Sequence, residues 1–428
     1  MPRWWVVLPV LVIAALAVIF FVNRRPPVFA DYVEWTYHGV LLRDWLQGHP
    51  DSAYLLKNYP VPNNLTTVGL GLLMLVMPWG TAAKVWLLIE VLLGLWCATK
   101  LQRAAGAAQG WQSMVVTAGA LVGINLWCGF SNFQFSTYFA MLFCALLMEN
   151  VESGWLYALL LVLLFFSHMI PFGFALCLLF LYAWQTGRWR LLWQTLPSIV
   201  LCVWYFAGRL THHDVDGTAG MVGSVPYGSL LFAAFRVNTY LKCWGFVNVA
   251  STFHDSILLK LVGPTVFVVL FALDVVVGGT VLALAICAAR NGLKKESRTR
   301  FFWIAVCVFF FVGLIMPGAA AGISDPGGRM LQLAAWCGVC AVVARRKWIG
   351  NMTAMCAAVL AGFSLYQVAV VAQTTLMQGT TEGPLPGTLR QFGHVVYTDR
   401  AVDYDNIVRG RMDADIYPTA MFLKRPER

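Results

Sequence analysis

Eleven apolar stretches, separated by more polar segments, constrain the fold of this chain more than any other feature. They cover residues 4–22, 81–99, 114–128, 133–148, 155–167, 170–185, 190–207, 264–289, 301–316, 328–344 and 350–372. A stretch of about 20 apolar residues crosses a bilayer as a helix, and shorter stretches cross where the membrane thins. The pattern therefore predicts an all-α polytopic membrane protein with about 11 transmembrane helices. Residues 65–79 are also apolar, and we interpret them as a re-entrant or interfacial helix.

Composition and charge argue against several other classes of protein. Apolar residues make up 59% of the chain and charged residues only 12%, whereas soluble domains carry about 25% charged residues. The mean hydropathy of +0.70 argues against a soluble enzyme or a disordered chain. The net charge of +10 comes largely from short basic runs between apolar stretches, at 100–103, 188–190, 294–300 and 345–347. Such runs are typical of cytoplasmic loops, so we expect membrane lipids and no nucleic acid as partners.

The basic runs also predict the orientation of the chain. If they face the cytoplasm, the segments 23–80 and 208–263 are outer loops, and the tail from residue 373 is also outside. Each of the two loops contains an amphipathic stretch, at 34–48 and 227–246, and we expect both stretches to be interfacial helices. We thus predict a transmembrane domain over 1–372 and a small extracytoplasmic tail over 373–428. The compact loops favour a bacterial inner membrane, with the functional site facing the periplasm or exterior.

The first outer loop holds the strongest candidates for catalysis. Asp31 follows the first apolar stretch closely, and Glu34 and His38 come three and seven residues later. This spacing places all three side chains on one face of a helix that begins near Asp31. A carboxylate near apolar surface acts as a general base for a hydroxyl group, and a nearby histidine tunes it. The alternative is that Asp31 is only the N-cap of this helix.

The motif around these residues resembles the first outer loop of the GT-C glycosyltransferases. The match consists of Asp31, His38, the segment Gly48-His49-Pro50 and the segment Tyr59-Pro60-Val61-Pro62. The number of spans and the long outer loops are similar to the protein O-mannosyltransferase arrangement. The resemblance implies a polyprenyl-phosphate-linked sugar donor and a lipid, glycan or protein acceptor.

The same resemblance implies particular roles for residues of the first loop. It assigns the catalytic base to Asp31 and implies inverting chemistry. The neighbouring position is Tyr32, where the family has a second acid, and Glu34 is the nearest substitute. Tyr59 belongs to the motif, and Lys57 beside it is a candidate for binding the carrier phosphate.

Other candidates for substrate or phosphate binding lie in later outer turns. Arg329 and Asp325 follow glycines in the turn at 317–329, where an arginine binds phosphate and a helix start adds N–H donors. The alternative is that these two residues only pair with each other. The family resemblance suggests that His168 and the turn at 129–135 line the cavity, against the alternative of a plain turn capped by Ser167. Arg236 in the second long loop is a further candidate.

Three alternatives remain open from the sequence. Glu90 and Asp274 lie within apolar stretches, and such residues are central to transporters or to flippases for lipid-linked glycans. The second long loop contains Arg209, His212, His213, Arg236 and His254, a set that favours a polysaccharide polymerase or ligase. The segment THHDVDG keeps a divalent cation open as a cofactor, although ligand spacing favours a solvated loop. No P-loop or dinucleotide motif occurs.

Overall fold

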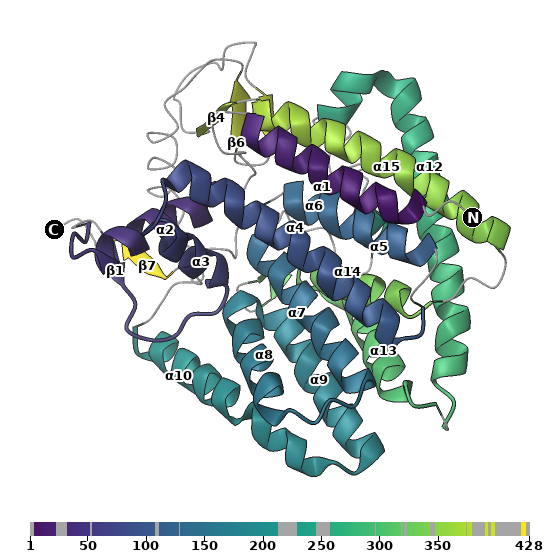
Figure 1. Cartoon of the computed structure of the whole chain (residues 1–428), viewed down its shortest axis with the longest axis horizontal. Coiled ribbons are helices and arrows are strands. Elements are labelled where there is room, and N and C mark those ends of the chain that lie inside the picture. The colour runs from purple at the N-terminus through teal and green to yellow at the C-terminus, as the bar shows by residue number, and fades with distance from the viewer. Residues whose placement is uncertain are drawn as a thin grey trace.

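Helices dominate the computed structural model of the chain (Figure 1). It describes residues 4–22, 32–51, 54–107, 111–127, 129–212, 229–244, 257–295, 297–317, 319–320, 323–342, 347–373, 375–378, 390–392, 395–398 and 421–424. Within these ranges, 6 helical segments are long and apolar enough to cross a membrane: Trp79–Ala104, Ser131–Met148, Met169–Thr186, Trp189–Leu210, Pro264–Gly292 and Trp348–Tyr366. The expectation of an all-α membrane protein agrees with this architecture.

The elements follow one another as the apolar pattern predicts, and each of the eleven expected stretches overlaps a helix. The first half contains α1 (Trp4–Val22), α2 (Tyr32–Leu46), β1 (Tyr54–Leu56), α3 (Leu65–Leu73), α4 (Trp79–Ala104), α5 (Trp111–Val122), α6 (Ile124–Trp127), α7 (Ser131–Met148), α8 (Gly154–Ser167) and α9 (Met169–Thr186). The second half contains η1 (Trp189–Thr195), α10 (Leu196–His212), α11 (Leu230–Leu241), η2 (Lys242–Trp244), α12 (Ile257–Gly292), α13 (Arg300–Ile315), β2 (Ala319–Ala320), β3 (Ile323–Ser324), α14 (Pro326–Cys340), α15 (Lys347–Gln373), β4 (Thr375–Gln378), β5 (Arg390–Phe392), β6 (Val395–Thr398) and β7 (Phe422–Lys424).

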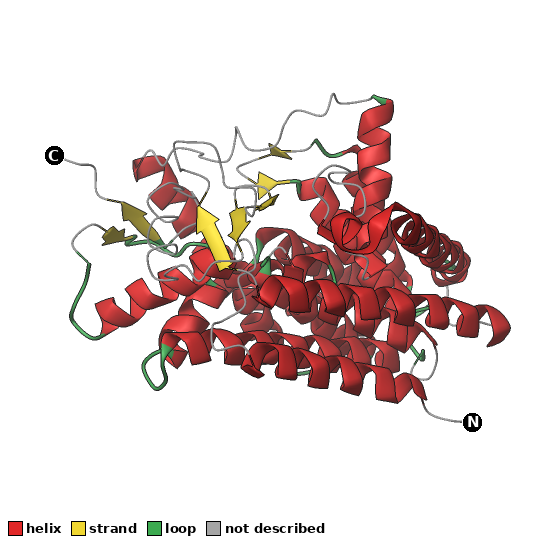
Figure 2. Cartoon of the chain, turned by 90° about the horizontal axis from the view of Figure 1, so that it is seen from above, coloured by secondary structure: helices red, strands yellow, loops and turns green. Residues whose placement is uncertain are grey.

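The core of the bundle lies where the middle helices meet. α4 packs against α7, α13 against α14, and α5 against α15, so helices distant in sequence become neighbours. Figure 1 shows α1 and α15 side by side along one edge of this bundle. In Figure 2 the short strands lie to one side of the helices. The beginning of α14 therefore lies next to helices from both halves of the chain.

The segment predicted to be the first outer loop packs against the bundle through α2 and α3. These helices approach closely because Gly39 faces Leu70 and Gly71 faces Leu42; a Cβ at Gly39 would lie 2.8 Å from the Cβ of Leu70. α3 has nine residues, too few to cross a bilayer alone. The amphipathic stretch predicted to lie on the membrane surface is thus largely covered by protein. Only its end, around Trp45, is well exposed.

A strand near the C-terminus returns to this loop. β7 pairs antiparallel with β1, with Leu423 opposite Leu55, and the Lys57 N–H donates to the Met421 carbonyl at 3.0 Å. Phe422 is 6% exposed and belongs to the apolar cluster that holds α2 and α3. The tail beyond residue 373 therefore contributes at least one strand to the first outer loop.

Candidate functional site

One polar pocket brings the first outer loop together with turns from three other parts of the chain. The space between the residues that line it is about 230 Å³, including the open solvent at its mouth. The pocket is lined by Trp35, Asn63, Phe130, Asn132, Phe133, His168 and Arg329.

Arg329 supplies the positive charge of the pocket. It lies in the first turn of α14, and its guanidinium carbon is 4.5 Å from the ring centroid of Phe130 and 5.2 Å from that of Phe133. Contact with aromatic faces holds the guanidinium in place. A guanidinium carries several N–H groups of the kind that bind phosphate or carboxylate oxygens.

His168 supplies a neutral hydrogen-bond donor beside that charge. It is the N-cap of α9, where its Nδ1 accepts from the Ile170 N–H at 3.2 Å. Burial, together with the positive charge of Arg329, holds the pKa of His168 well below its usual range. A neutral imidazole that accepts at Nδ1 carries its proton on Nε2. The Nε2–H is therefore a second donor for an anion, and the cap is His168 itself rather than Ser167.

Asn132 fixes the first outer loop against this pocket. Its Oδ1 accepts from the Thr66 N–H at 2.8 Å, and its Nδ2 donates to the Asn63 carbonyl at 2.8 Å. Next to it, the Asn64 N–H donates to the Phe166 carbonyl at 2.7 Å. Asn63 has a φ of 65°, a left-handed conformation that asparagine tolerates better than most residues. The edge of the pocket thus depends on hydrogen bonds between segments far apart in sequence.

The predicted catalytic residues lie in and next to α2, which contributes Trp35 to the pocket wall. Glu34 and His38 are 2% and 3% exposed, respectively, and the His38 ring meets the Trp35 ring edge-on at 5.9 Å between centroids. Asp31, the predicted base, directly precedes α2 in the sequence and lies outside the described residues. The helix predicted to begin near Asp31 is present and starts at Tyr32.

We expect His38 to make the fold sensitive to acid. Burial, and secondarily the positive charge of Lys57, lowers the pKa of His38 to about 4 from 6.5. The His38 imidazole therefore takes up a proton near pH 6.5 in the unfolded chain, but only near pH 4 in the folded chain. Stability falls as pH falls through this window, by up to about 3 kcal/mol.

Thermal unfolding of the purified chain, measured at several pH values across this window, checks this expectation. His38→Leu removes the titrating group, so the variant should lose less stability on acidification than the wild type, whatever its stability at neutral pH. Equal losses in the two proteins would show that His38 does not cause the pH dependence.

The other predicted phosphate ligands lie elsewhere. Lys57 Nζ is 5.6 Å from the Tyr59 ring centroid, and Tyr59 packs against Tyr205 and Gly208 of α10. Neither Lys57 nor Tyr59 lines the pocket. Arg236 forms an ion pair with Asp325 at 2.5 Å. His168 and Arg329 therefore line the same pocket, whereas Arg236 and Asp325 form an ion pair with each other.

The acidic residues of the apolar stretches occupy separate surroundings. Glu90 of α4 accepts a hydrogen bond from Ser131. Asp274 is fully buried in α12, and α4 and α12 are not among the principal helix contacts. This separation does not favour a proton path that links the two carboxyl groups.

Side chains that could bind a metal are dispersed in the described part of the chain. No group of three or more His, Cys, Asp or Glu side chains gathers there in a way that could hold an ion. Most of the segment THHDVDG, from His213 onward, lies outside the described residues.

Some pocket residues were not foreseen from the sequence. Trp35 was expected on the membrane surface, and Asn63 was not considered. The Asn63-Asn64 pair directly before a helix is a readable turn signal, but its place beside α7 depends on the tertiary fold.

The chain matches no protein-family model, no curated protein and no solved structure.

Proposed function

We propose that the chain is a membrane glycosyltransferase that transfers a sugar from a polyprenyl-phosphate-linked donor to an acceptor on the outer face of the membrane. One observation carries the proposal: Arg329 and His168 meet in a pocket whose wall includes Trp35 from the first outer loop. This loop contains the motif that resembles GT-C enzymes. The proposal includes eleven membrane crossings, a location in a bacterial inner membrane and a site that faces the periplasm.

The pocket suits the phosphate of such a donor. The phosphate would lie in the pocket, and the polyprenyl chain would extend from it into the membrane along the surrounding apolar helices. Arg329 and the Nε2–H of His168 donate to the phosphate oxygens. Because the phosphate gains negative charge as it leaves, donors fixed in place stabilise the transition state more than the bound donor. The ring of Trp35 offers an apolar face to the sugar.

The reaction follows from these roles. Asp31 takes the proton of the acceptor hydroxyl, and the hydroxyl oxygen attacks the anomeric carbon of the sugar. The bond from that carbon to the phosphate oxygen breaks, with inversion at the carbon. The polyprenyl phosphate leaves with the electron pair, and Asp31 later returns its proton to solvent. Glu34 and His38, on the same helix, shape the surroundings of the base.

Deletion of the chain from its host tests this proposal. Mass spectrometry would quantify polyprenyl-phosphate-linked sugars and envelope glycans in cells without the chain and in cells complemented with it. We expect one lipid-linked sugar to accumulate in the deletion strain and one glycan modification to disappear, both reversed by complementation. Identical profiles in the two strains would refute the proposal. If Glu90→Gln abolished function while Asp31→Asn had no effect, the transporter hypothesis would replace it.

A further inference from the structure

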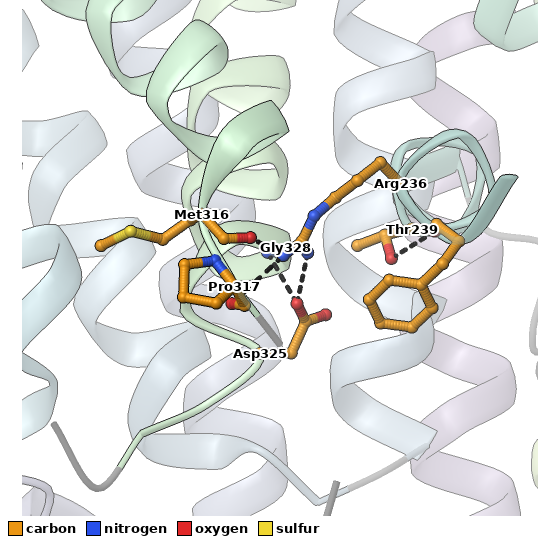
Figure 3. A network of polar contacts seen from close by, with 7 residues as sticks. Arg236, Thr239, Met316, Pro317, Asp325 and Gly328 are labelled. Atoms are coloured by element: carbon orange, nitrogen blue, oxygen red, sulfur yellow. Dashed lines mark hydrogen bonds and ion pairs between the residues drawn. The ribbon is translucent and has the colours of Figure 1, made fainter. Parts of the chain in front are cut away.

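Arg236 connects three elements near the outer end of the bundle (Figure 3). Its Nη1 donates to Asp325 Oδ1 at 2.5 Å, and its Nη2 donates to the carbonyls of Met316 and Pro317. The side chain is 2% exposed, and its guanidinium carbon is 4.9 Å from the Phe232 ring centroid. Arg236 thereby ties α11 to the end of α13 and to the residue that begins α14.

Asp325 links Arg236 to the first turn of α14. The Oδ1 that receives Arg236 also accepts from the Gly328 N–H at 3.1 Å, and Asp325 is the N-cap with a φ of 45°. A Cβ at Gly327 would lie 2.7 Å from the Arg236 Nη2. Only glycine therefore allows the guanidinium to approach this closely. The orientation of the turn depends on the ion pair.

Arg329 lies on the other side of the same turn. Residues two apart in a helix differ by roughly 200° around its axis, so Gly327 faces Arg236 while Arg329 faces Phe130 and Phe133. A change in the anchoring of Asp325 moves the turn and with it the guanidinium in the pocket. Because a phosphate is recognised by directed N–H donors, a small displacement weakens binding.

We propose that Arg236 is a positioning residue, which acts through Asp325 to hold Arg329 in its phosphate-binding place. This inference rests on the proposed function, because it assumes that the pocket binds a phosphate. It differs from the earlier prediction that Arg236 and Asp325 bind phosphate themselves. The Arg236 side chain is 2% exposed and that of Asp325 is 28% exposed. Burial of a guanidinium is costly, and a role in setting the geometry of a site accounts for that cost.

Binding of farnesyl phosphate to the purified full-length chain in detergent tests the proposal, with farnesol as the probe that lacks the phosphate. We expect Arg236→Gln to weaken binding of farnesyl phosphate by about tenfold and to leave the weak binding of farnesol unchanged. Asp325→Asn should behave similarly, because asparagine still caps the helix but loses the charge. Arg236→Lys should recover part of the affinity, since lysine keeps the charge but not the fork of donors.

A matched control separates positioning from general loss of structure. Tyr240 also anchors α11, through a hydrogen bond of 2.9 Å from its hydroxyl to the Gly278 carbonyl of α12, but it does not touch α14 through that bond. Tyr240→Phe should lower the temperature of unfolding and leave the affinity for farnesyl phosphate unchanged.

The outcomes distinguish this inference from the proposed function. If Arg329→Gln loses binding while Arg236→Gln and Asp325→Asn bind like the wild type, the positioning role is wrong and the proposed function is unaffected. If Tyr240→Phe weakens binding as much as Arg236→Gln, the effect is general loss of structure and the positioning role is again overturned. If Arg329→Gln binds normally, or farnesol binds as well as farnesyl phosphate, the phosphate pocket itself is refuted.

Discussion

Replacement of Arg329 by glutamine is expected to reduce sugar transfer by about 100-fold, the usual loss when one donor to a developing anion is removed. Glutamine keeps a polar but shorter side chain and removes the charge and the fork of N–H donors of the guanidinium. The measurement is the rate of sugar incorporation into the acceptor by membrane vesicles that contain the variant. The donor is the lipid-linked sugar that accumulates in cells without the chain.

Two control variants show whether the loss of transfer is specific to the Arg329 guanidinium. Arg290→Gln removes an exposed arginine in the last turn of α12, far along the chain from the pocket, and should leave the rate unchanged. Arg329→Lys keeps the charge and should lose less than Arg329→Gln. If Arg329→Gln transferred sugar at the rate of Arg290→Gln, Arg329 would have no part in the reaction.

Replacement of Asp31 by asparagine is expected to reduce transfer by roughly 1,000-fold, because the acceptor hydroxyl then has no base to take its proton. This substitution also separates the two hypotheses for Asp31. Asparagine is as good an N-cap as aspartate, so a role in capping α2 predicts almost no effect on stability or rate. The same vesicle assay, together with thermal unfolding of the purified variant, measures both quantities.

Asp44→Asn, in α2, is the matched control. Asp44 forms an ion pair with Arg43 at 2.6 Å, and the two side chains are 31% and 27% exposed. A pair that stays in contact with solvent contributes about 1 kcal/mol or less. The control should therefore retain full activity. Substantial transfer by Asp31→Asn would remove Asp31 from the mechanism and leave Glu34 as the next candidate, to be tested as Glu34→Gln.

The positions of most helices were predictable because helices that cross a membrane consist of long runs of apolar residues. The stretch expected at 4–22 coincides with α1, and the stretch at 155–167 differs from α8 by one residue. The beginning of α12 differs more, because it was expected at residue 264 and lies at Ile257. The beginning of α14, expected at residue 328, lies at Pro326. The Asp325-Pro326 pair is a recognisable N-cap followed by proline in the first turn, so local chemistry rather than apolarity sets that boundary.

The site was only partly predictable, because its geometry depends on contacts between distant segments. Arg329 was expected to bind phosphate from its residue type, and His168 was expected to line the cavity from the family resemblance. The structure brings the two into one pocket. No local pattern relates Arg236 to Asp325, which are 89 positions apart. The same holds for Asn132, whose amide fixes the backbone of Asn63 and Thr66. Patterns of charge and turn residues identify candidates but do not identify their partners.

The measurement that tests the central claim most directly is the profile of polyprenyl-phosphate-linked sugars in cells whose only copy of the chain carries Arg329→Gln. The proposed function predicts that one lipid-linked sugar accumulates to nearly the level of the deletion strain, while cells with Arg290→Gln show the wild-type profile. If cells with Arg329→Gln showed the wild-type profile at equal protein levels, the pocket would not hold the phosphate of a sugar donor, and the central claim would be contradicted.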